Sequence, residues 1–267
     1  MKKLVHPKRR LSLEQLAAAV ELNSAEWMRL EGRLSWVQLH DDPDVLWLFS
    51  GDSWPRNHVA LARFTEATAH RRVGEILAPH LAAKADCNWI VGPVSRPADL
   101  NRHLKAHGFS CRIHCVAMAC DLDALPPPPR MPGDVKINLV DEPPSLDPLT
   151  TERRRRRQEG RVAIARFRPR RVWHFTANSA GRIAGETTLF DGSAVAGLYN
   201  VEVIKEFRGR GIGTALVHAA ASHARKLGQR TAVLGATGLG QGVYSRIGFR
   251  EVGKLSFWKY GKMRQLP

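Results

Sequence analysis

The stretch at residues 208–214, Arg-Gly-Arg-Gly-Ile-Gly-Thr, has the residue types of an anion-binding loop. An alternating β-branched run that ends at Val203 precedes it, and an Ala-rich helical pattern that ends at Leu227 follows it. At such a junction the first amides of the helix have no partner within the helix, and the helix dipole adds positive charge beside them. Glycines at alternate positions leave room for a bulky anion to approach the backbone. The sequence therefore predicts a phosphate site; the alternative is a glycine-rich turn without a ligand.

Two common phosphate-binding loops do not fit this stretch. A P-loop needs Gly-Lys-Ser/Thr at its end, and no lysine follows these glycines. The dinucleotide fingerprint needs Gly-x-Gly-x-x-Gly and an acidic residue about 20 residues further on. Here the order is Gly-x-Gly-x-Gly, and residues 228–230, Gly-Gln-Arg, stand where the acid is expected. The loop therefore belongs to neither class.

The loop does resemble motif A of the GCN5-related N-acetyltransferases, the GNAT family, which reads Arg/Gln-x-x-Gly-x-Gly/Ala. Arg208, Gly211 and Gly213 fill its defined positions, and Val203 stands five residues before the arginine, as is common in that family. The resemblance implies that the loop amides bind the pyrophosphate of acetyl-coenzyme A (acetyl-CoA), the acyl-donor substrate. The residues expected at this cofactor are Val201, Val203, Arg208, Gly209, Arg210, Gly211, Ile212, Gly213 and Thr214.

The resemblance covers about residues 134–260, because the elements expected there follow the order of the acetyltransferase core. In that fold the strand that ends at Val203 diverges from its neighbour, and the resemblance implies that its exposed backbone groups pair with the pantetheine arm. The expected strands are 135–140, 172–177, 183–190, 198–203, 231–234 and 249–260, with helices in the segment up to Phe167, over 214–227 and around Tyr244. The turn at 178–181, Asn-Ser-Ala-Gly, contains residues that tolerate positive φ.

Tyr244 is the candidate general acid. Residues 237–249 resemble motif B of the family, in which a tyrosine seven residues after an asparagine and five before a phenylalanine lies beside the coenzyme sulfur. Tyr244 is five residues before Phe249, but Thr237 replaces the asparagine, which departs from the motif. A tyrosine hydroxyl with a pKa of about 10 stays protonated and can protonate the leaving thiolate. The alternative is an aromatic core residue on a short helix.

A base for the acceptor amine is sought on the strands around motif A. Glu202 follows Val201 and precedes Val203, so its side chain lies on the opposite face of the strand. It could take the amine proton directly or through water, and Glu186 on the preceding strand is the second choice. Either carboxylate could instead be a surface or ion-paired residue.

The first half of the chain contains a weak repeat of the second. A helix that ends in Leu104 and a strand that starts at Gly108-Phe109 have the spacing of Tyr244 and Gly248-Phe249. The repeat predicts a degenerate GNAT-like domain, as in tandem members of the family; the alternative is that two unrelated α/β domains share a Gly-Phe strand start. The loop glycines are missing between residues 57 and 73, and Leu104 replaces the tyrosine. The expected elements are helices over 11–39 (capped by Ser12), around 73–81 and over 97–107, and strands over 45–49, 57–64, 89–92 and 109–122.

The run Pro126–Pro129, with Pro132-Gly133 after it, predicts a stiff linker because prolines lack ladder donors. The predicted organisation is a degenerate GNAT-like domain at residues 1–125, a linker at 126–133 and an acetyltransferase domain at 134–267. The fold class is therefore α/β (α+β), with two GNAT-like domains that each contain a mixed, mostly antiparallel sheet flanked by helices.

The composition of the chain indicates its broad class, the compartment in which we expect it and the state of its cysteines. Of 267 residues, 43% are hydrophobic and 25% charged, as in globular proteins, and no apolar run approaches the ~18 residues of a membrane span. The basic start lacks the apolar core of a signal peptide, so we expect a cytoplasmic protein. Four cysteines without metal-ligand spacing predict buried thiols and no metal site; they are Cys87, Cys111, Cys115 and Cys120.

The net charge of +16 leaves a nucleic-acid partner possible but not favoured, since arginines are spread over the whole chain. The run Arg153–Arg157 is interpreted as a solvated face or mobile loop rather than a phosphate-binding patch. The main hypothesis is an acyl-CoA-dependent N-acyltransferase that transfers acetyl to a primary amine by direct attack in a ternary complex. The alternatives are a non-catalytic acyl-CoA-binding regulatory protein and a basic nucleic-acid-binding protein. The acceptor and the oligomeric state stay open.

Overall fold

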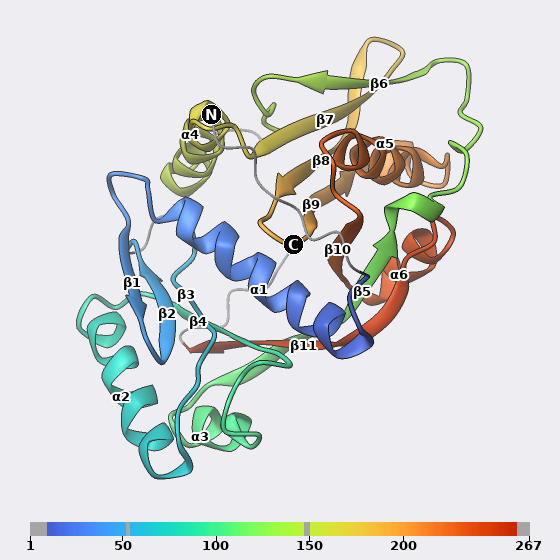
Figure 1. Ribbon diagram of the computed structural model, residues 1–267. Coiled ribbons are helices and arrows are strands. Elements are labelled where there is room, and N and C mark those ends of the chain that lie inside the picture. The colour runs from blue at the N-terminus through green and yellow to red at the C-terminus, as the bar shows by residue number, and fades with distance from the viewer. Residues whose placement is uncertain (1–9, 52–53, 147–149, 261–267) are drawn as a thin grey trace.

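One continuous sheet of 11 strands runs through the described part of the computed structural model (Figure 1). The structure describes residues 10–51, 54–146 and 150–260; the basic start, residues 1–9, lies outside them. The strand order is β1-β2-β3-β4-β11-β5-β10-β9-β8-β7-β6. Neighbouring strands are antiparallel except for the pairs β3–β4 and β9–β10. The sheet is therefore mixed and mostly antiparallel, as the sequence predicts.

The first half contains α1 (Leu13–Glu31), β1 (Gln38–Asp42), β2 (Val45–Phe49), β3 (His58–Ala60), α2 (Glu66–Ala82), β4 (Cys87–Val91), α3 (Leu100–Ala106), β5 (Ser110–Asp121) and the 3-10 turn η1 (Leu122–Ala124). The second half contains β6 (Val135–Val140), α4 (Glu152–Arg166), β7 (Val172–Ser179), β8 (Arg182–Asp191), β9 (Ala196–Val203), η2 (Lys205–Phe207), α5 (Ile212–Lys226), β10 (Thr231–Ala236), α6 (Gly238–Ser245) and β11 (Arg250–Tyr260). None of these helices combines the length and apolar composition that a membrane span requires.

The two halves exchange their last strands. β5, from the first half, pairs with β10 of the second half on one side, in a register from Thr231–Asp121 to Ala236–Val116. On its other side β5 pairs with β11, and β11 in turn pairs with β4 of the first half. Each half thus supplies a strand that completes the other half's part of the sheet. The limits 1–125 and 134–267 stay a prediction.

Helices cover both faces of the sheet. Successive residues of β10 show which helix lies on which face, because side chains alternate along a strand. Ala232 and Leu234 pack in the same apolar cluster as α5, whereas Val233 packs with α1. A second cluster joins the end of α1 to α4 through Leu30 and Ile164. α5 therefore covers one face of the second half, and α1 and α4 lie on the opposite face.

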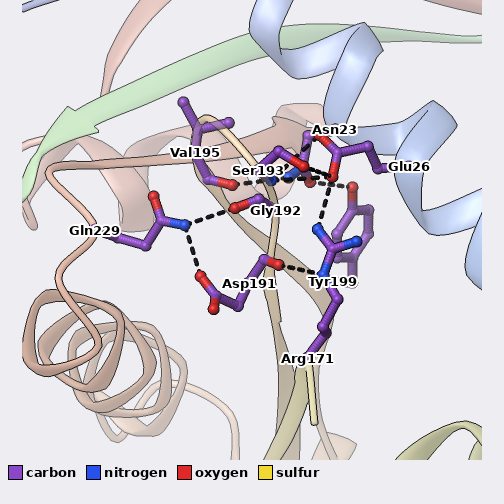
Figure 2. A network of polar contacts seen from close by, with 9 residues as sticks. All are labelled: Asn23, Glu26, Arg171, Asp191, Gly192, Ser193, Val195, Tyr199 and Gln229. Atoms are coloured by element: carbon purple, nitrogen blue, oxygen red, sulfur yellow. Dashed lines mark hydrogen bonds and ion pairs between the residues drawn. The ribbon is translucent and has the colours of Figure 1, made fainter. Parts of the chain in front are cut away.

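Polar contacts fasten α1 to the turn between β8 and β9 (Figure 2). Asn23, which is buried, donates from Nδ2 to the carbonyl of Val195 at 2.9 Å and accepts from the Tyr199 hydroxyl at 2.6 Å. Arg171 forms an ion pair with Glu26 at 2.6 Å. The first helix of the chain is thus held by the second half as well as by its own.

The predicted repeat is confirmed at the helix-to-strand junctions. Phe109 N–H donates to the carbonyl of Leu104 at 3.0 Å, and Phe249 N–H donates to the carbonyl of Tyr244 at 3.1 Å. The strands that follow, β5 and β11, lie next to each other in the sheet. Leu104 therefore occupies the position in the first half that Tyr244 occupies in the second.

Apart from the helix predicted around 73–81, which already begins at Glu66, the predicted elements agree with the structure within two residues at each end, with three exceptions in the first half. The helix predicted over 11–39 begins with the expected capping box at Ser12 but ends at Glu31. Leu39 packs against Gly32, where the chain turns back, and residues 38–42 form the edge strand β1. Because β1 is mostly exposed, it carries little apolar alternation for a sequence pattern to detect.

The other two exceptions are elements that are shorter than predicted, and the local backbone geometry explains where each one ends or begins. The strand predicted over 57–64 is only His58–Ala60, since Leu61 adopts φ +55°, which a strand cannot accommodate. The helix predicted from 97 begins at Leu100, because residues 97–99 form a turn in which Leu100 N–H donates to the Pro97 carbonyl at 3.0 Å.

Candidate active site

β9 and β10 pair at only two positions, Ala196 with Ala232 and Gly197 with Val233. Beyond Gly197 the two strands diverge, although β9 continues to Val203. The ladder between them therefore leaves the backbone of residues 198–203 without β10 as a partner on that side. This confirms the predicted divergence of the strand that ends at Val203. An extended ligand can add its own donors and acceptors to such an edge.

The glycine loop follows directly after this edge and opens towards solvent. Gly209 and Gly211 have φ +79° and +76°, and a Cβ at either would meet no atom within 4 Å. Gly211 is also the N-cap of α5 and has no side chain to bond the first amides of the helix. The first amides of α5 therefore have no side-chain cap. The loop thus fits an anionic group such as the pyrophosphate of coenzyme A.

The two arginines of the loop brace it against the strands. Arg208 donates from Nε to the Val203 carbonyl at 3.0 Å. Arg210 forms an ion pair with Asp134 at 2.7 Å and donates to Ser179 Oγ at 3.0 Å. Ser179 and then Arg210 lower the pKa of Asp134. The Arg210 guanidinium is therefore engaged beside the paired ends of β6 and β7, and its predicted role at the phosphates stays a prediction.

The two candidate bases lie opposite each other on neighbouring strands. Glu186 of β8 is in register with Glu202 of β9, so their side chains lie on the same face of the sheet. Val201 and Val203 pack with the α5-side cluster, which confirms that Glu202 lies on the other face, towards α4. The structure thus brings both candidates together.

The two carboxylates differ in their surroundings. Glu202 is exposed, whereas Glu186 is 2% exposed and forms an ion pair with Arg161 of α4, with 2.6 Å between Nη2 and Oε2. Burial raises the pKa of Glu186, while the positive charges of Arg161 and Arg157 oppose that shift. Glu186 is held in place by its partner, and Glu202 is the more accessible of the two.

A small pocket connects these carboxylates to one face of α4. Its lining consists of Ser145, Leu146, Arg154, Arg157, Gln158, Arg161, Glu186 and Glu202. The run Arg153–Arg157 forms the start of α4, so the expectation of a mobile loop is wrong. The expectation of a solvated face holds only in part, because Arg155 is exposed and the other four arginines are half-buried. The sequence does contain the signal, since positions 154, 157, 158 and 161 recur at helical spacing on one face.

Tyr244 lies on the other side of the sheet. Its ring is half-buried against the α5-side cluster and covers Gly240 so closely that a Cβ there would come within 2.7 Å of the ring. Burial raises the pKa of Tyr244, which keeps its hydroxyl protonated. Tyr244 follows the diverging end of β10, whereas Glu202 is on β9 and faces α4. The two predicted catalytic residues therefore flank the strand opening from opposite faces.

Comparison with known proteins shows which family the sequence around this site resembles. Residues 138–249 match the sequence profile of the acetyltransferase (GNAT) family. Residues 138–249 therefore form a GNAT domain. A search of the curated proteins found no match.

Solved GNAT structures resemble nearly the whole chain. A GCN5-related N-acetyltransferase from Kribbella flavida is 15% identical with a TM-score of 0.68, over 92% of this chain and 96% of that one. A tandem GNAT protein from the clavulanic acid biosynthesis pathway is 19% identical with a TM-score of 0.58, over 86% and 85%. A GCN5-related N-acetyltransferase from Sphaerobacter thermophilus is 16% identical with a TM-score of 0.57, over 96% of both chains. At these identities the likeness establishes the fold.

Among the described residues of the first half, the turn before α2 contains no glycine loop. Helix α2 begins at Glu66 after a capping box in which Thr65 and Thr68 bond each other's backbone amides. These side chains occupy amides that a phosphate would need. The site with open amides is thus at α5 in the second half.

Proposed function

We propose that the protein transfers an acetyl group from acetyl-CoA to a primary amine, within a ternary complex of enzyme and both substrates. The unpaired edge of β9, which leads directly into the open glycine loop, carries this proposal. It offers an extended thioester a row of backbone groups and offers its phosphates the amides of a helix start. The GNAT domain at residues 138–249 supports the same donor.

The coenzyme would lie along the end of β9 and the glycine loop that follows it. The pantetheine arm would pair with the backbone at Val201 and Val203, and the pyrophosphate would accept hydrogen bonds from the amides of the loop. Arg208 would hold the loop in register through its bond to Val203. The residues of this proposed site are Val201, Val203, Arg208, Gly209, Arg210, Gly211, Ile212, Gly213 and Thr214.

In the transfer, the amine nitrogen bonds to the acetyl carbonyl carbon, and the carbon–sulfur bond breaks as the intermediate collapses. Glu202 would take the amine proton, directly or through water, because it is the exposed carboxylate of the pocket. Glu186 is the second choice. Tyr244, with its raised pKa, would give a proton to the departing thiolate of coenzyme A.

The domain organisation and the location of the protein are part of the same proposal. We assign residues 1–125 and 134–267 to two GNAT-like domains joined by the linker 126–133 and expect a cytoplasmic location. The first domain supplies β5 to the sheet of the second.

Calorimetric titration with acetyl-CoA tests the donor site. The Gly211→Glu variant should lose binding, because a side chain would project into the space that the phosphate needs. Gly51→Glu is a matched control: Gly51 also has positive φ and open surroundings, but lies in the first half. Wild-type binding that Gly51→Glu keeps and Gly211→Glu loses supports the proposal. Equal binding by all three proteins, or none by the wild type, would refute it.

Release of the coenzyme thiol in the presence of amines tests the transfer itself. The wild type should turn over, and Tyr244→Phe should bind acetyl-CoA normally but turn over slowly. A protein that binds acetyl-CoA without turnover for any amine would instead support the regulatory alternative.

A further inference from the structure

Arginines from both halves of the chain gather on the Glu202 side of the strand opening. Arg154, Arg157 and Arg161 line the pocket together with the two carboxylates. Three guanidiniums against two carboxylates give this lining a net positive charge. The positive charge lies on the face towards which the proposed base points.

Arg161 is built into the wall of this pocket. Its side chain is 7% exposed, and its Nη1 donates to the Pro144 carbonyl at 3.1 Å while its Nη2 pairs with Glu186. Within the described residues, its Nε finds no acceptor. A buried N–H group without a partner is costly, so a ligand oxygen or a water molecule in the pocket would stabilise it.

The first half adds a further guanidinium beside this wall. Partial loss of water and the positive charges of Arg153 and Arg157 lower the pKa of Arg56. Trp54, two residues before Arg56, brings this segment of the first half to α4, since its ring packs so closely on Gly160 that no Cβ would fit there. Like charges near one another repel, and an anion bound among them would offset that repulsion.

We propose that the acceptor carries an anionic group, a carboxylate or a phosphate, as well as its amine, and that Arg154 and Arg157 bind that group. This inference rests on the proposed acetyl transfer. With the anionic group on α4, the amine of the same molecule lies on the side of Glu202, because Glu202 and both arginines line one pocket. A guanidinium matches a carboxylate or phosphate in geometry as well as in charge. The arginines act on the acceptor only, so the bonds that form and break in the transfer are unchanged.

Anion binding to the coenzyme A complex tests this site. Saturating coenzyme A fills the loop, and succinate or inorganic phosphate is then titrated into the wild type and into Arg154→Gln, Arg157→Gln and Arg155→Gln. Arg155 is the matched control, because it lies on the same helix but is exposed. We expect about tenfold weaker binding in the first two variants, as for a lost charge-assisted contact, and no change in the control. The anion that binds more tightly, succinate or phosphate, indicates whether the anionic group of the acceptor is a carboxylate or a phosphate.

Two results would overturn the inference: no anion binding with coenzyme A in place, or an equal loss in Arg155→Gln. These are distinct from failure of the proposed function, which shows as absent binding of acetyl-CoA to the wild type. Turnover gives a second readout with paired amines that differ only in a carboxylate, such as lysine and cadaverine. Lysine, which carries the carboxylate, should have the higher kcat/KM, and Arg157→Gln should remove that preference by raising KM. A preference for cadaverine would contradict the inference.

Discussion

Replacement of Arg161 by methionine should destabilise the protein strongly. Arg161 and Glu186 form an ion pair at 2.6 Å with side chains that are 7% and 3% exposed. Removal of one partner leaves a buried charge uncompensated, which costs about 3–5 kcal/mol. Because Arg157 also stabilises the charge of Glu186, we expect the lower end, about 3 kcal/mol. Urea unfolding at pH 7.5 measures this loss, with the exposed Arg155→Met as the control, which should change by less than about 0.5 kcal/mol.

The loss should depend on pH with a definite sign. Burial already raises the pKa of Glu186, and without Arg161 it rises further above the unfolded value of about 4.3. A carboxyl with a raised folded pKa reduces stability as pH climbs from its unfolded pKa to its folded pKa. The deficit of the variant should therefore be larger at pH 7.5 than at pH 4.5, because the proton that Glu186 takes up at low pH removes the uncompensated buried charge. An equal deficit at both values would refute the reasoning, as would a double variant Arg161→Met/Glu186→Leu that is no more stable than the single one.

Three further predictions concern the site and the sheet. Tyr244→Phe should lower kcat about 10²–10⁴-fold with little change in the Kd of acetyl-CoA, measured by thiol release and calorimetry, because it removes only the proton for the thiolate; an unchanged kcat would exclude the role. Glu202→Gln should lower kcat similarly, measured by thiol release, because it removes the proposed acceptor of the amine proton; an unchanged kcat would move the base to Glu186. Residues 134–267 produced alone should not fold, because they lack β5 between β10 and β11; a native far-UV spectrum and a sharp thermal transition would contradict this.

Much of the second half follows from local sequence patterns. Alternation and helical spacing locate its strands and helices, and the glycines of residues 209–213 mark the loop, since these signals depend on nearby residues only. The equivalence of Leu104 and Tyr244 is also visible, because a Gly-Phe pair ends each helix at the same spacing. The placement of Glu202 on the face opposite Val201 and Val203 follows from strand geometry alone.

What escapes the sequence depends on contacts between distant residues. The polar edge strand β1 is held by its pairing with β2, not by its own apolar pattern. The exchange of β5 and β11 is invisible, because a strand's sequence does not state its neighbours. In the sequence, the arginines of α4 look like a run of solvated charges. Only the fold shows that Arg161 pairs with Glu186 and that Trp54 packs on Gly160 of the same helix. The arginine lining of the pocket was therefore missed, although the glycine loop and the two carboxylates were predicted.

The strand exchange between the two halves also affects the folding of the chain during synthesis and the deletions that it can tolerate in evolution. β11 is the last strand of the second half, yet it fills the gap between β4 and β5 of the first half. During synthesis β4 and β5 therefore keep open edges until β11 has left the ribosome. The same arrangement makes the first half indispensable even though it lacks the glycine loop. A deletion that removed it would also remove β5 from the second half, so selection on the second half alone suffices to keep both copies in one gene.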